Sequence, residues 1–488
     1  MKSAPMNNET IPLFTMISTY ISFLVLIVVG HLRDILGKIF YPASYRYLQR
    51  QNDMEPLYTD FESFFTRRLY TRIRDCWNRP ITGVPGRIIK ILDRTSSDQN
   101  KTFKFTGTYT EAMNIGSYNY LGLATNEGNI IDSVINTVNK FPVNYPGTSR
   151  DIGINPVNRE LEREMADFLQ KEDCIVFSMG FGTNSCNLPV IIGDGCLVLS
   201  DEFNHTSIIY GLRMSNAVIK KFAHNNMKDL ERKLKYYISQ GQPVTHRAWK
   251  KVFLLVEGIY SMEGTIVKLK EIIELKKKYK FYLFIDEAHS IGALGATGRG
   301  VCEYLGVDFS EVDILMGTYT KSFGGSGGYI AGSKELIMYL RYYSDFSLFG
   351  EQMAPAVATQ ILESLKVMKY SPRGKELAKN LKENTILFRQ KLTELGYILF
   401  GDHDSPVVPL MIFNPGKIAA FSRMCLERKL AVVVVGYPAT PVISSRVRFC
   451  MSAAHTRHDI EAMVRIIDYV GSSIGLKIIS NRRKIKLE

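Results

Sequence analysis

The sequence predicts an α/β protein whose central sheet is mostly parallel, preceded by a membrane helix. Apolar runs of strand length alternate with segments of helical periodicity through the middle of the chain, which is typical of βαβ units. The 488 residues exceed one ordinary hydrophobic core, so two packed domains are expected. Strands are expected near Ile175, Leu197, Val252, Phe281, Ile314 and Tyr329, with a helix over Leu269 to Tyr279.

The first element of the chain is an apolar segment. Residues 11–30 contain no charged side chain and are long enough to span a bilayer as a helix. A secretory signal peptide is the alternative, but no basic cluster precedes the segment and no small-residue cleavage site follows it. Several basic residues follow the segment, whereas Lys2 alone precedes it, which places the rest of the chain on the cytoplasmic side of a single span. The basic residues that follow are Arg33, Lys38, Arg46 and Arg50.

Apolar residues continue at helical spacing beyond this span. Residues 31–41 therefore predict a second helix, lying in the membrane interface. We expect residues 1–50 to form the membrane anchor and residues 51–155 to pack on the catalytic body. A large domain is expected over residues 156–365, and a smaller α+β domain with a basic tail over residues 366–488.

The segment around Lys321 is the first candidate site. It follows the apolar run from Val312 to Met316 and precedes the glycine-rich residues 324–328, which permit tight turns. An accessible amine on constrained backbone can form a Schiff base with an aldehyde cofactor. A solvated basic loop between two strands is the alternative for this segment taken alone.

Asp286 and His289 follow a predicted buried strand, residues 281–285. A carboxylate at such a strand end lies where open α/β sheets bind ligands. Asp286 can pair with a protonated pyridine nitrogen, and His289 can reach a phenolic oxygen of the same ring. A helix cap and a core histidine are the alternative. The letters Asp-Glu-Ala-His also form a helicase motif, but no Gly-Lys pair of the chain is followed by Ser or Thr, which excludes the phosphate loop of such motors.

Three further segments carry candidate ligand-binding residues. Gly180 and Phe181 lie in a run of small residues after a predicted strand, which suits the close approach of a phosphate. His205 can stack on an aromatic cofactor, with a structural histidine as the alternative. Arg446 and Arg448 alternate along a predicted strand and can bind a substrate carboxylate, with exposed strand charges as the alternative.

Charge and cysteine content bound the remaining classes of function. The net charge is +13, but no basic and aromatic nucleic-acid module is found. An anionic membrane face and the phosphates of an acyl-CoA are therefore the expected partners, and nucleic acid is not. The seven cysteines are odd in number and form no Cys-x-x-Cys pair, which indicates reduced thiols in a body that faces the cytosol.

Together and in this order, these segments resemble the α-oxoamine synthases, pyridoxal-phosphate enzymes that condense an amino acid with an acyl-CoA and release carbon dioxide. The resemblance covers residues 80 to 470, and it implies a fold-type I transferase, similar to aspartate aminotransferase. The large domain of that fold has a mostly parallel, seven-stranded sheet and binds pyridoxal 5'-phosphate (PLP). The markers of the resemblance are residues 114–122, 201–207, 257–264, 286–289, 320–321 and 452–456.

Within this family, Thr318 to Gly324 and Arg74 to Ile81 are similar to segments of the catalytic subunits of eukaryotic serine palmitoyltransferase. This resemblance implies the condensation of L-serine with palmitoyl-CoA to 3-ketodihydrosphingosine, the first step of sphingolipid biosynthesis. It also implies the endoplasmic reticulum membrane as the location. One departure is Asn158, which stands where soluble relatives have a histidine, so the role of that histidine is not carried over.

The resemblance assigns the ring of the cofactor to four residues. Lys321 is implied as the Schiff-base lysine and the residue that moves protons. Asp286 is implied to pair with the pyridine nitrogen, and His289 to contact the phenolic oxygen. His205 is implied to stack on the ring.

The resemblance assigns the phosphate and the substrate to other residues. Gly180, Phe181 and Thr318 are implied to hold the phosphate. Arg448 is implied to bind the carboxylate of the substrate, because its offset from the family marker at residues 451–455 fits better than that of Arg446.

A partner chain is also implied, because family members place the active site between two subunits. It can be a non-catalytic sister subunit of the long chain base 1 type, forming a heterodimer, or a second copy of this chain. Two other functions stay open: a related synthase that uses glycine or a shorter acyl-CoA, and a non-catalytic assembly subunit of a membrane complex. The apolar span argues against the first, and the intact Lys321 against the second.

Overall fold

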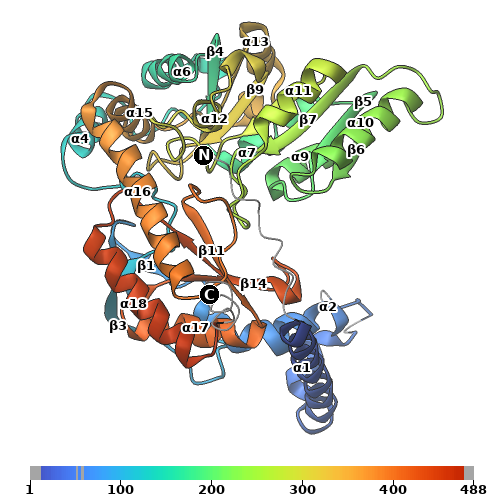
Figure 1. The fold of residues 1–488 in the computed structure, drawn as a ribbon, viewed down its shortest axis with the longest axis vertical. Helices are drawn as coiled ribbons and strands as arrows, with labels where there is room; N and C mark the ends of the chain where they lie inside the picture. The colour runs from blue at the N-terminus through green and yellow to red at the C-terminus, as the bar shows by residue number, and fades with distance from the viewer. Residues whose placement is uncertain (1–12, 51–52, 57–59, 478–488) are drawn as a thin grey trace, which may run out of the picture.

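The computed structural model describes residues 13–50, 53–56 and 60–477. Lys2, the first two residues of the apolar segment and the expected basic tail lie outside the described residues. Figure 1 shows a large domain around one sheet, a smaller domain beneath it, and helix α1 at the edge of the smaller domain that is remote from the large one.

The large domain is built on a seven-stranded sheet in the order β4-β10-β9-β8-β7-β5-β6. Its strands are β4 (Asp173–Phe177), β5 (Cys196–Asp201), β6 (Val218–Phe222), β7 (Lys251–Glu257), β8 (Tyr282–Asp286), β9 (Ile314–Thr318) and β10 (Gly328–Gly332). Strand β10 runs antiparallel to both of its neighbours, and the other pairs are parallel. The predicted fold class is thus confirmed, and β6 is a strand that the sequence pattern did not predict.

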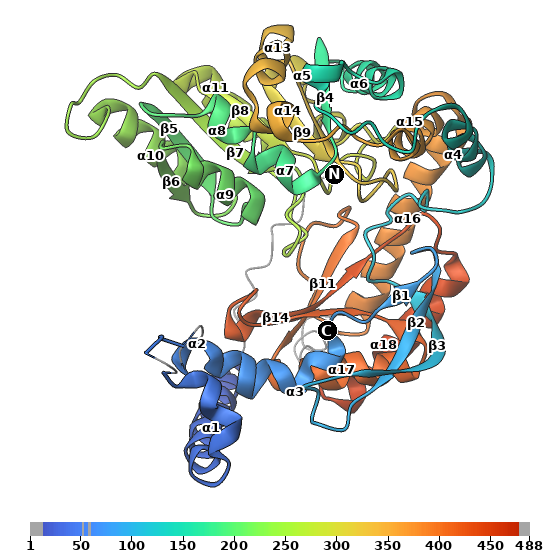
Figure 2. The ribbon, with the colours of Figure 1, turned by 180° about the vertical axis from the view of Figure 1, so that it is seen from behind.

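Both faces of this sheet are buried. Leu254 and Leu255 are neighbours on β7, yet they belong to two different hydrophobic clusters, one on each face. Helices therefore cover both sides, as Figures 1 and 2 show. These helices are α4 (Asn129–Lys140), α5 (Ser149–Ile152), α6 (Pro156–Phe168), α7 (Gly180–Ser185), α8 (Leu188–Ile191), α9 (Thr206–Met214), α10 (Met227–Gln240), α11 (Leu269–Tyr279), α12 (Val301–Leu305), η4 (Phe309–Glu311), α13 (Lys334–Tyr343), α14 (Asp345–Phe349) and α15 (Pro355–Tyr370).

The small domain contains two sheets. The first has the order β11-β14-β13 and is antiparallel, and the second has the order β1-β2-β3-β12. The pairing of β3 with β12 joins the residues before 155 to the C-terminal part of the chain. The elements are β1 (Ile81–Thr82), β2 (Ile88–Thr95), β3 (Lys104–Asn114), α16 (Pro372–Glu394), β11 (Val407–Phe413), α17 (Pro415–Glu427), β12 (Leu430–Ala431), β13 (Val433–Val435), η5 (Val442–Ser444), β14 (Ser445–Cys450) and α18 (Arg457–Ser473).

The expected boundary between residues 365 and 366 falls inside a helix. Helix α15 continues through it to Tyr370 and packs against α4 and α6 of the large domain. Ser371 then separates α15 from α16, which extends toward the small domain in Figure 1. A break at Ser371 agrees with this packing better than a break at residue 365.

The N-terminal arm begins with α1 (Leu13–Phe40), which among the described residues is the one helix long and apolar enough to cross a membrane. It runs without interruption through the residues for which we expected a separate interfacial helix. The rest of the arm consists of η1 (Pro42–Leu48), α2 (Asp60–Phe65), η2 (Thr66–Tyr70), α3 (Thr71–Ile73) and η3 (Arg74–Cys76).

Glu287 connects the end of β8 to helix α12. Its buried carboxylate accepts hydrogen bonds from the backbone N–H of Val301, at 3.1 Å, and from the Ser290 hydroxyl. Gly300 is required beside it, because a Cβ there would lie 2.4 Å from a carboxylate oxygen. Burial raises the pKa of Glu287 to about 7.

We expect Glu287→Gln to flatten the pH dependence of stability. A raised pKa means that the folded protein binds the proton more tightly, so the contribution of Glu287 is complete below the unfolded value of 4.5 and is lost as pH rises through 7. The ionised form costs about 3 kcal/mol at pH 8, and glutamine removes that cost. Thermal unfolding of both proteins at pH 5 and pH 8 checks this: an equal change in melting temperature for the two proteins would contradict it.

Candidate active site

Four polar residues meet at one edge of the large sheet. They end four strands, as Asp201 on β5, Glu257 on β7, Asp286 on β8 and Thr318 on β9. These strands are parallel, so their carboxyl ends lie on the same side, where α/β sheets bind ligands. Glu257 pairs directly with Asp286 in the register of β7 and β8.

Lys321 lies three residues after β9 and reaches this edge. Its Nζ is 3.3 Å from Thr318 Oγ1 and 5.8 Å from the centre of the Tyr118 ring. No carboxylate pairs with it among the described residues. Desolvation lowers the pKa of Lys321 although Asp286 and Glu257 oppose the shift, so its amine is deprotonated more readily than an exposed lysine.

Asp286 is buried and receives two hydrogen bonds. Asn184 Nδ2 donates to its Oδ2 at 2.8 Å, and the backbone N–H of Ala288 donates to its Oδ1 at 2.9 Å. Asn184 also donates to the Ser207 hydroxyl, so it links β8 to the helix that begins beside His205. The carboxylate of Asp286 is thereby held in one orientation without a cationic partner.

His289 is held by two tyrosines. Its Nδ1 is 2.8 Å from the Tyr120 hydroxyl, and its ring meets the Tyr118 ring edge-on at 5.0 Å. Burial, followed by the nearby Lys321 and Arg448, places the pKa of His289 well below its usual value, whereas burial raises that of Tyr120. The Tyr120 hydroxyl can donate to an unprotonated Nδ1 or accept from a protonated one. In the first of these two tautomers, Nε2 carries the proton of the neutral ring and is the nitrogen that can donate to a ligand.

His205 caps helix α9 and presents an exposed ring. Its Nδ1 lies 2.7 Å from the Ser207 hydroxyl, and its backbone N–H donates to Glu257. Partial desolvation lowers the pKa of His205 although the residue is exposed, and burial together with Asp286 raises that of Glu257 well above its usual value. The exposure of His205 makes its ring accessible to a planar ligand at this edge of the sheet.

Gly180, Phe181 and Thr318 come together where α7 approaches β9. A Cβ on Gly180 would lie 3.0 Å from Thr318 Cγ2, so the glycine permits this approach. Phe181 is exposed, and its ring lies 6.3 Å from that of His205. The three predicted phosphate residues therefore share one corner of the site, beside Lys321.

The two arginines of β14 differ in their partners. Arg446 donates to the carbonyl of Met262 at 2.7 Å and forms an ion pair with Glu263 at 3.4 Å. Arg448 is equally buried, but no carboxylate pairs with it among the described residues, and its Nε lacks any hydrogen-bond partner. Its guanidinium lies 4.8 Å from the centre of the Tyr118 ring. Arg448 is thus the arginine that remains available to an anionic ligand.

The arrangement fits PLP. Within residues 13–50, 53–56 and 60–477, Lys321 forms no ion pair with a carboxylate and Asp286 none with a cation, and His205 is close enough for the charges of both to affect its pKa. An aldehyde, a pyridine nitrogen and an aromatic plane are the groups that complement these three residues. The predicted cofactor residues therefore come together at one edge of the sheet.

Four residues of this site were missed by sequence reasoning. Tyr118 and Tyr120 lie inside the 114–122 marker, which we cited for the resemblance without giving them a role. Glu257 likewise opens the 257–264 marker. Asn184 lies four residues after Gly180, and only its contact with Asp286 across the fold reveals its function.

Asn158 lies outside the candidate site, buried on α6. Its backbone N–H donates to the side-chain oxygen of Asn155, which caps the helix, and its Nδ2 donates to the carbonyl of Met353 at 3.2 Å. None of these contacts involves a residue of the candidate site. Asn158 therefore acts as a structural residue of the large domain.

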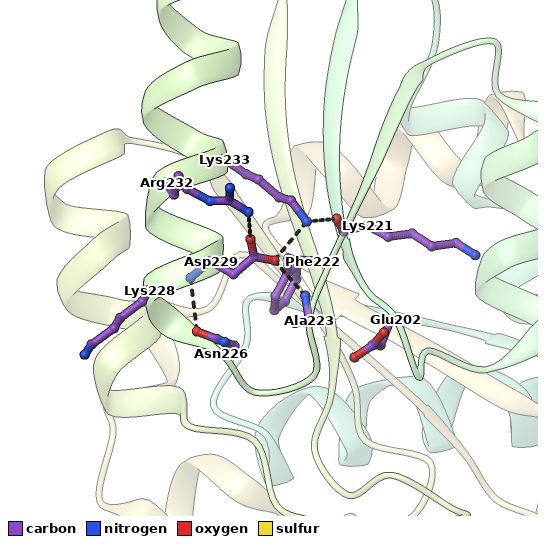
Figure 3. Close-up of a pocket in the computed structure, with 9 residues that line it drawn as sticks. All are labelled: Glu202, Lys221, Phe222, Ala223, Asn226, Lys228, Asp229, Arg232 and Lys233. Carbon is purple, nitrogen blue, oxygen red and sulfur yellow. Dashed lines mark hydrogen bonds and ion pairs between the residues drawn. The ribbon is translucent and has the colours of Figure 1, made fainter. Parts of the chain in front are cut away.

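A separate hollow of about 650 Å³ opens between β6 and α10, as Figure 3 shows. Asp229 at its centre pairs with Arg232 and, at 2.8 Å, with Lys233. Lys221 and Lys228 extend away from this carboxylate in the figure. The hollow contains none of the predicted site residues, and its central carboxylate is already paired with two basic side chains.

The family model of "Aminotransferase class I and II" matches residues 110–467 of this chain. The chain is 47% identical to "Serine palmitoyltransferase 3" of Homo sapiens, over 98% of this chain and 88% of that protein. It is 46% identical to "Serine palmitoyltransferase 2" of Saccharomyces cerevisiae, over 96% of this chain and 84% of that protein. It is also 46% identical to "Long chain base biosynthesis protein 2b" of Arabidopsis thaliana, over 96% of both chains.

Two solved structures that this chain resembles are also serine palmitoyltransferases, at lower sequence identity. "Sphingomonas wittichii Serine palmitoyltransferase" is 25% identical to this chain and has a TM-score of 0.76. The alignment covers 86% of this chain and all of that one. A high-resolution structure of "SPT with PLP internal aldimine" is also 25% identical, with a TM-score of 0.74 over 86% of this chain and all of that one.

Proposed function

The chain belongs to the class I and II aminotransferase family, among its serine palmitoyltransferases, and we propose that it is a catalytic subunit of such an enzyme. The reaction is the PLP-dependent, decarboxylative condensation of L-serine with palmitoyl-CoA. Its products are 3-ketodihydrosphingosine, coenzyme A and carbon dioxide. This reaction starts sphingolipid biosynthesis.

One observation carries this proposal at the level of the site. Lys321 and Arg448 both lie against Tyr118, at 5.8 and 4.8 Å from the ring centre, and neither pairs with a carboxylate among the described residues. The charge of Arg448 contributes to the lowered pKa of Lys321, and an anionic ligand at this place would compensate the buried charge of Arg448. An amino acid held on the cofactor at Lys321 brings its carboxylate to Arg448.

When bound, PLP withdraws electrons from the α-carbon of the amino acid, so that a bond to that carbon can break. Lys321 holds the cofactor through Nζ, and its lowered pKa lets the free amine accept the α-proton of serine. Asp286 pairs with the ring nitrogen. His289 donates from Nε2 to the phenolic oxygen, and His205 stacks on the ring.

The other groups orient the reactants. Gly180, Phe181 and Thr318 would hold the phosphate of the cofactor. Arg448 binds the carboxylate of serine in bidentate fashion. By fixing this carboxylate, Arg448 would orient the α-carbon of serine and so help to select which of its bonds breaks.

Membrane attachment through α1 fits a substrate with a long acyl chain. We propose a single span in the endoplasmic reticulum membrane with the catalytic body in the cytosol, which the basic residues after the apolar segment support. We further propose a heterodimer with a non-catalytic subunit of the long chain base 1 type. Exposed aromatic rings on α13 and α14 would provide a surface for it. These rings belong to Tyr339, Tyr342, Tyr343 and Phe349.

The reaction is tested with labelled L-serine and palmitoyl-CoA in membranes that carry this chain and the sister subunit. We expect a labelled ketone product, and Lys321→Ala should reduce its rate by at least about 100-fold because both cofactor attachment and proton transfer are lost. Lys379→Ala, an exposed lysine on α16, is the matched control and should retain full activity.

Two outcomes would contradict the proposal. Product with glycine or a shorter acyl-CoA but not with serine and palmitoyl-CoA would indicate a related synthase. Inertness toward every amino acid and acyl-CoA, with no cofactor bound to the purified complex, would indicate an assembly subunit.

The two arginines should respond differently to substitution. Arg448→Lys keeps the charge but loses the bidentate fork, so kcat/KM for serine should fall about 10- to 100-fold with little change in melting temperature. Arg446→Lys keeps a charge beside Glu263 but cannot also donate to the carbonyls of Ser444 and Met262, so it should lower the melting temperature more than the affinity for serine. Steady-state kinetics and thermal unfolding of both variants check this, and a reversed pattern would assign the carboxylate to Arg446.

Tyr120→Phe should disturb the tautomer of His289. Without the donor to Nδ1, the proton is no longer confined to Nε2, so we expect a shift in the absorption spectrum of the bound cofactor and an activity about 3- to 10-fold lower. Tyr329→Phe is the matched control, because its buried hydroxyl has no partner. The measurement is the absorption spectrum of the bound cofactor in each variant as a function of pH. Identical titrations of Tyr120→Phe and the parent protein would show that Tyr120 does not set the tautomer of His289.

A further inference from the structure

One side of helix α1 is packed against the protein along most of its length. Thr19, Gly30 and Asp34 are buried, and their spacings of eleven and four residues place them on one stripe of the helix. Before Gly30 most of the remaining surface of the helix is apolar and exposed, and Arg33 and Lys38 are exposed beyond it. The body of the protein therefore lies beside the membrane helix as well as beyond its end.

Charged and aromatic contacts fix the second half of α1. Asp34 forms ion pairs with Arg67, at 2.6 Å, and with Arg68. His31 stacks on Phe64 at 4.1 Å. A buried carboxylate between two arginines does not allow the helix to slide, because separating the charges would leave them buried and unpaired.

The first half of α1 meets the connection between β13 and β14, which is residues 436–444. Phe23 of α1 touches Tyr437 edge-on at 6.1 Å, and Tyr437 in turn touches Phe65 of α2 at 5.1 Å. Helix α1 also lies against η5 at the end of this connection. The connection is thus part of the same surface as the membrane helix.

The composition of the connection suits a lipid environment. Residues 436–444 contain no charged side chain, and Tyr437, Pro438, Ala439 and Pro441 are exposed. Tyrosine is enriched where proteins cross the boundary between headgroups and hydrocarbon. An exposed, uncharged turn beside an apolar helix is continuous with the surface that the bilayer covers.

The depth of the contact follows from helical geometry. Phe23 precedes Arg33, the first Lys or Arg after the apolar segment, by ten residues, or about 15 Å along the helix. Half of the hydrocarbon core of a bilayer is also about 15 Å thick. With Arg33 at the headgroups, a ring that touches Phe23 lies below them.

We propose that the β13–β14 connection inserts into the cytosolic leaflet beside α1 and forms a lipid-contacting surface of the catalytic body. Strands β13 and β14 pair Val433 with Arg448, so the inserted connection joins the two strands that hold the arginine of the site. Given the proposed function, which this step assumes, the acyl chain of the substrate and the long-chain product would pass between bilayer and site along this surface.

The insertion is tested by a fluorescent probe on Ala439→Cys in the full complex, reconstituted in vesicles of phosphatidylcholine with some phosphatidylserine. Of the native cysteines, six are buried, and the unsubstituted protein gives the background of Cys186. We expect an emission shifted to shorter wavelength than in detergent, and quenching by nitroxides on the lipid chains. Val244→Cys, 94% exposed on the large domain, is the matched control and should respond only to iodide in the water.

The result does not depend on catalysis, so a failure of insertion is distinguishable from a failure of the proposed reaction. Quenching of the Ala439 probe by iodide alone would overturn the proposal. So would a probe that neither quencher reaches once the sister subunit is present, because the sister subunit would then cover the connection. In a catalytic arm, Ala439→Asp should raise KM for palmitoyl-CoA several-fold and leave KM for a short, water-soluble acyl-CoA unchanged, whereas Ala439→Ser should affect neither.

Discussion

The register of β7 and β8 places two carboxyl groups side by side, and the other groups of the site are arranged around this buried pair. Glu257 pairs with Asp286 across the two strands. Burial and the neighbouring Asp286 raise the pKa of Glu257 well above its usual value. Glu257 accepts the backbone N–H of His205, and Asn184 donates to Asp286. These hydrogen bonds fix the orientation of both carboxyl groups at the edge of the sheet that Lys321 reaches.

The sequence predicted the strands whose residues are uniformly apolar and the polar residues that follow them. Strand β6 was not predicted because Lys220 and Lys221 interrupt its apolar run at the edge of the sheet, where solvent is available. The roles of Tyr120 and Asn184 were not predicted for another reason. Their partners lie 169 and 102 residues away in the chain, and no local pattern specifies such contacts.

The N-terminal arm illustrates the same limit. The apolar spacing after residue 30 suggested a change of element, yet α1 continues because no residue interrupts its helical geometry. The two glycines of this stretch act through tertiary packing. A Cβ on Gly30 would lie 2.8 Å from the Phe64 ring, and one on Gly37 would lie 2.3 Å from Tyr45 Oη. Periodicity in a single segment cannot reveal that another segment returns to pack against it.

The antiparallel strand β10 has a consequence for the order in which the protein is made. It lies between β4 and β9, so β4 has no neighbour in the sheet until the chain has been synthesised beyond Gly332. At a ribosomal rate of about 5–20 residues per second, roughly 300 residues and some 15–60 s separate α1 from β10. With α1 inserted in the membrane as proposed, the nascent chain is attached well before the sheet closes, so the edges of β4 and β9 stay unpaired on a membrane-bound chain rather than on a freely diffusing intermediate.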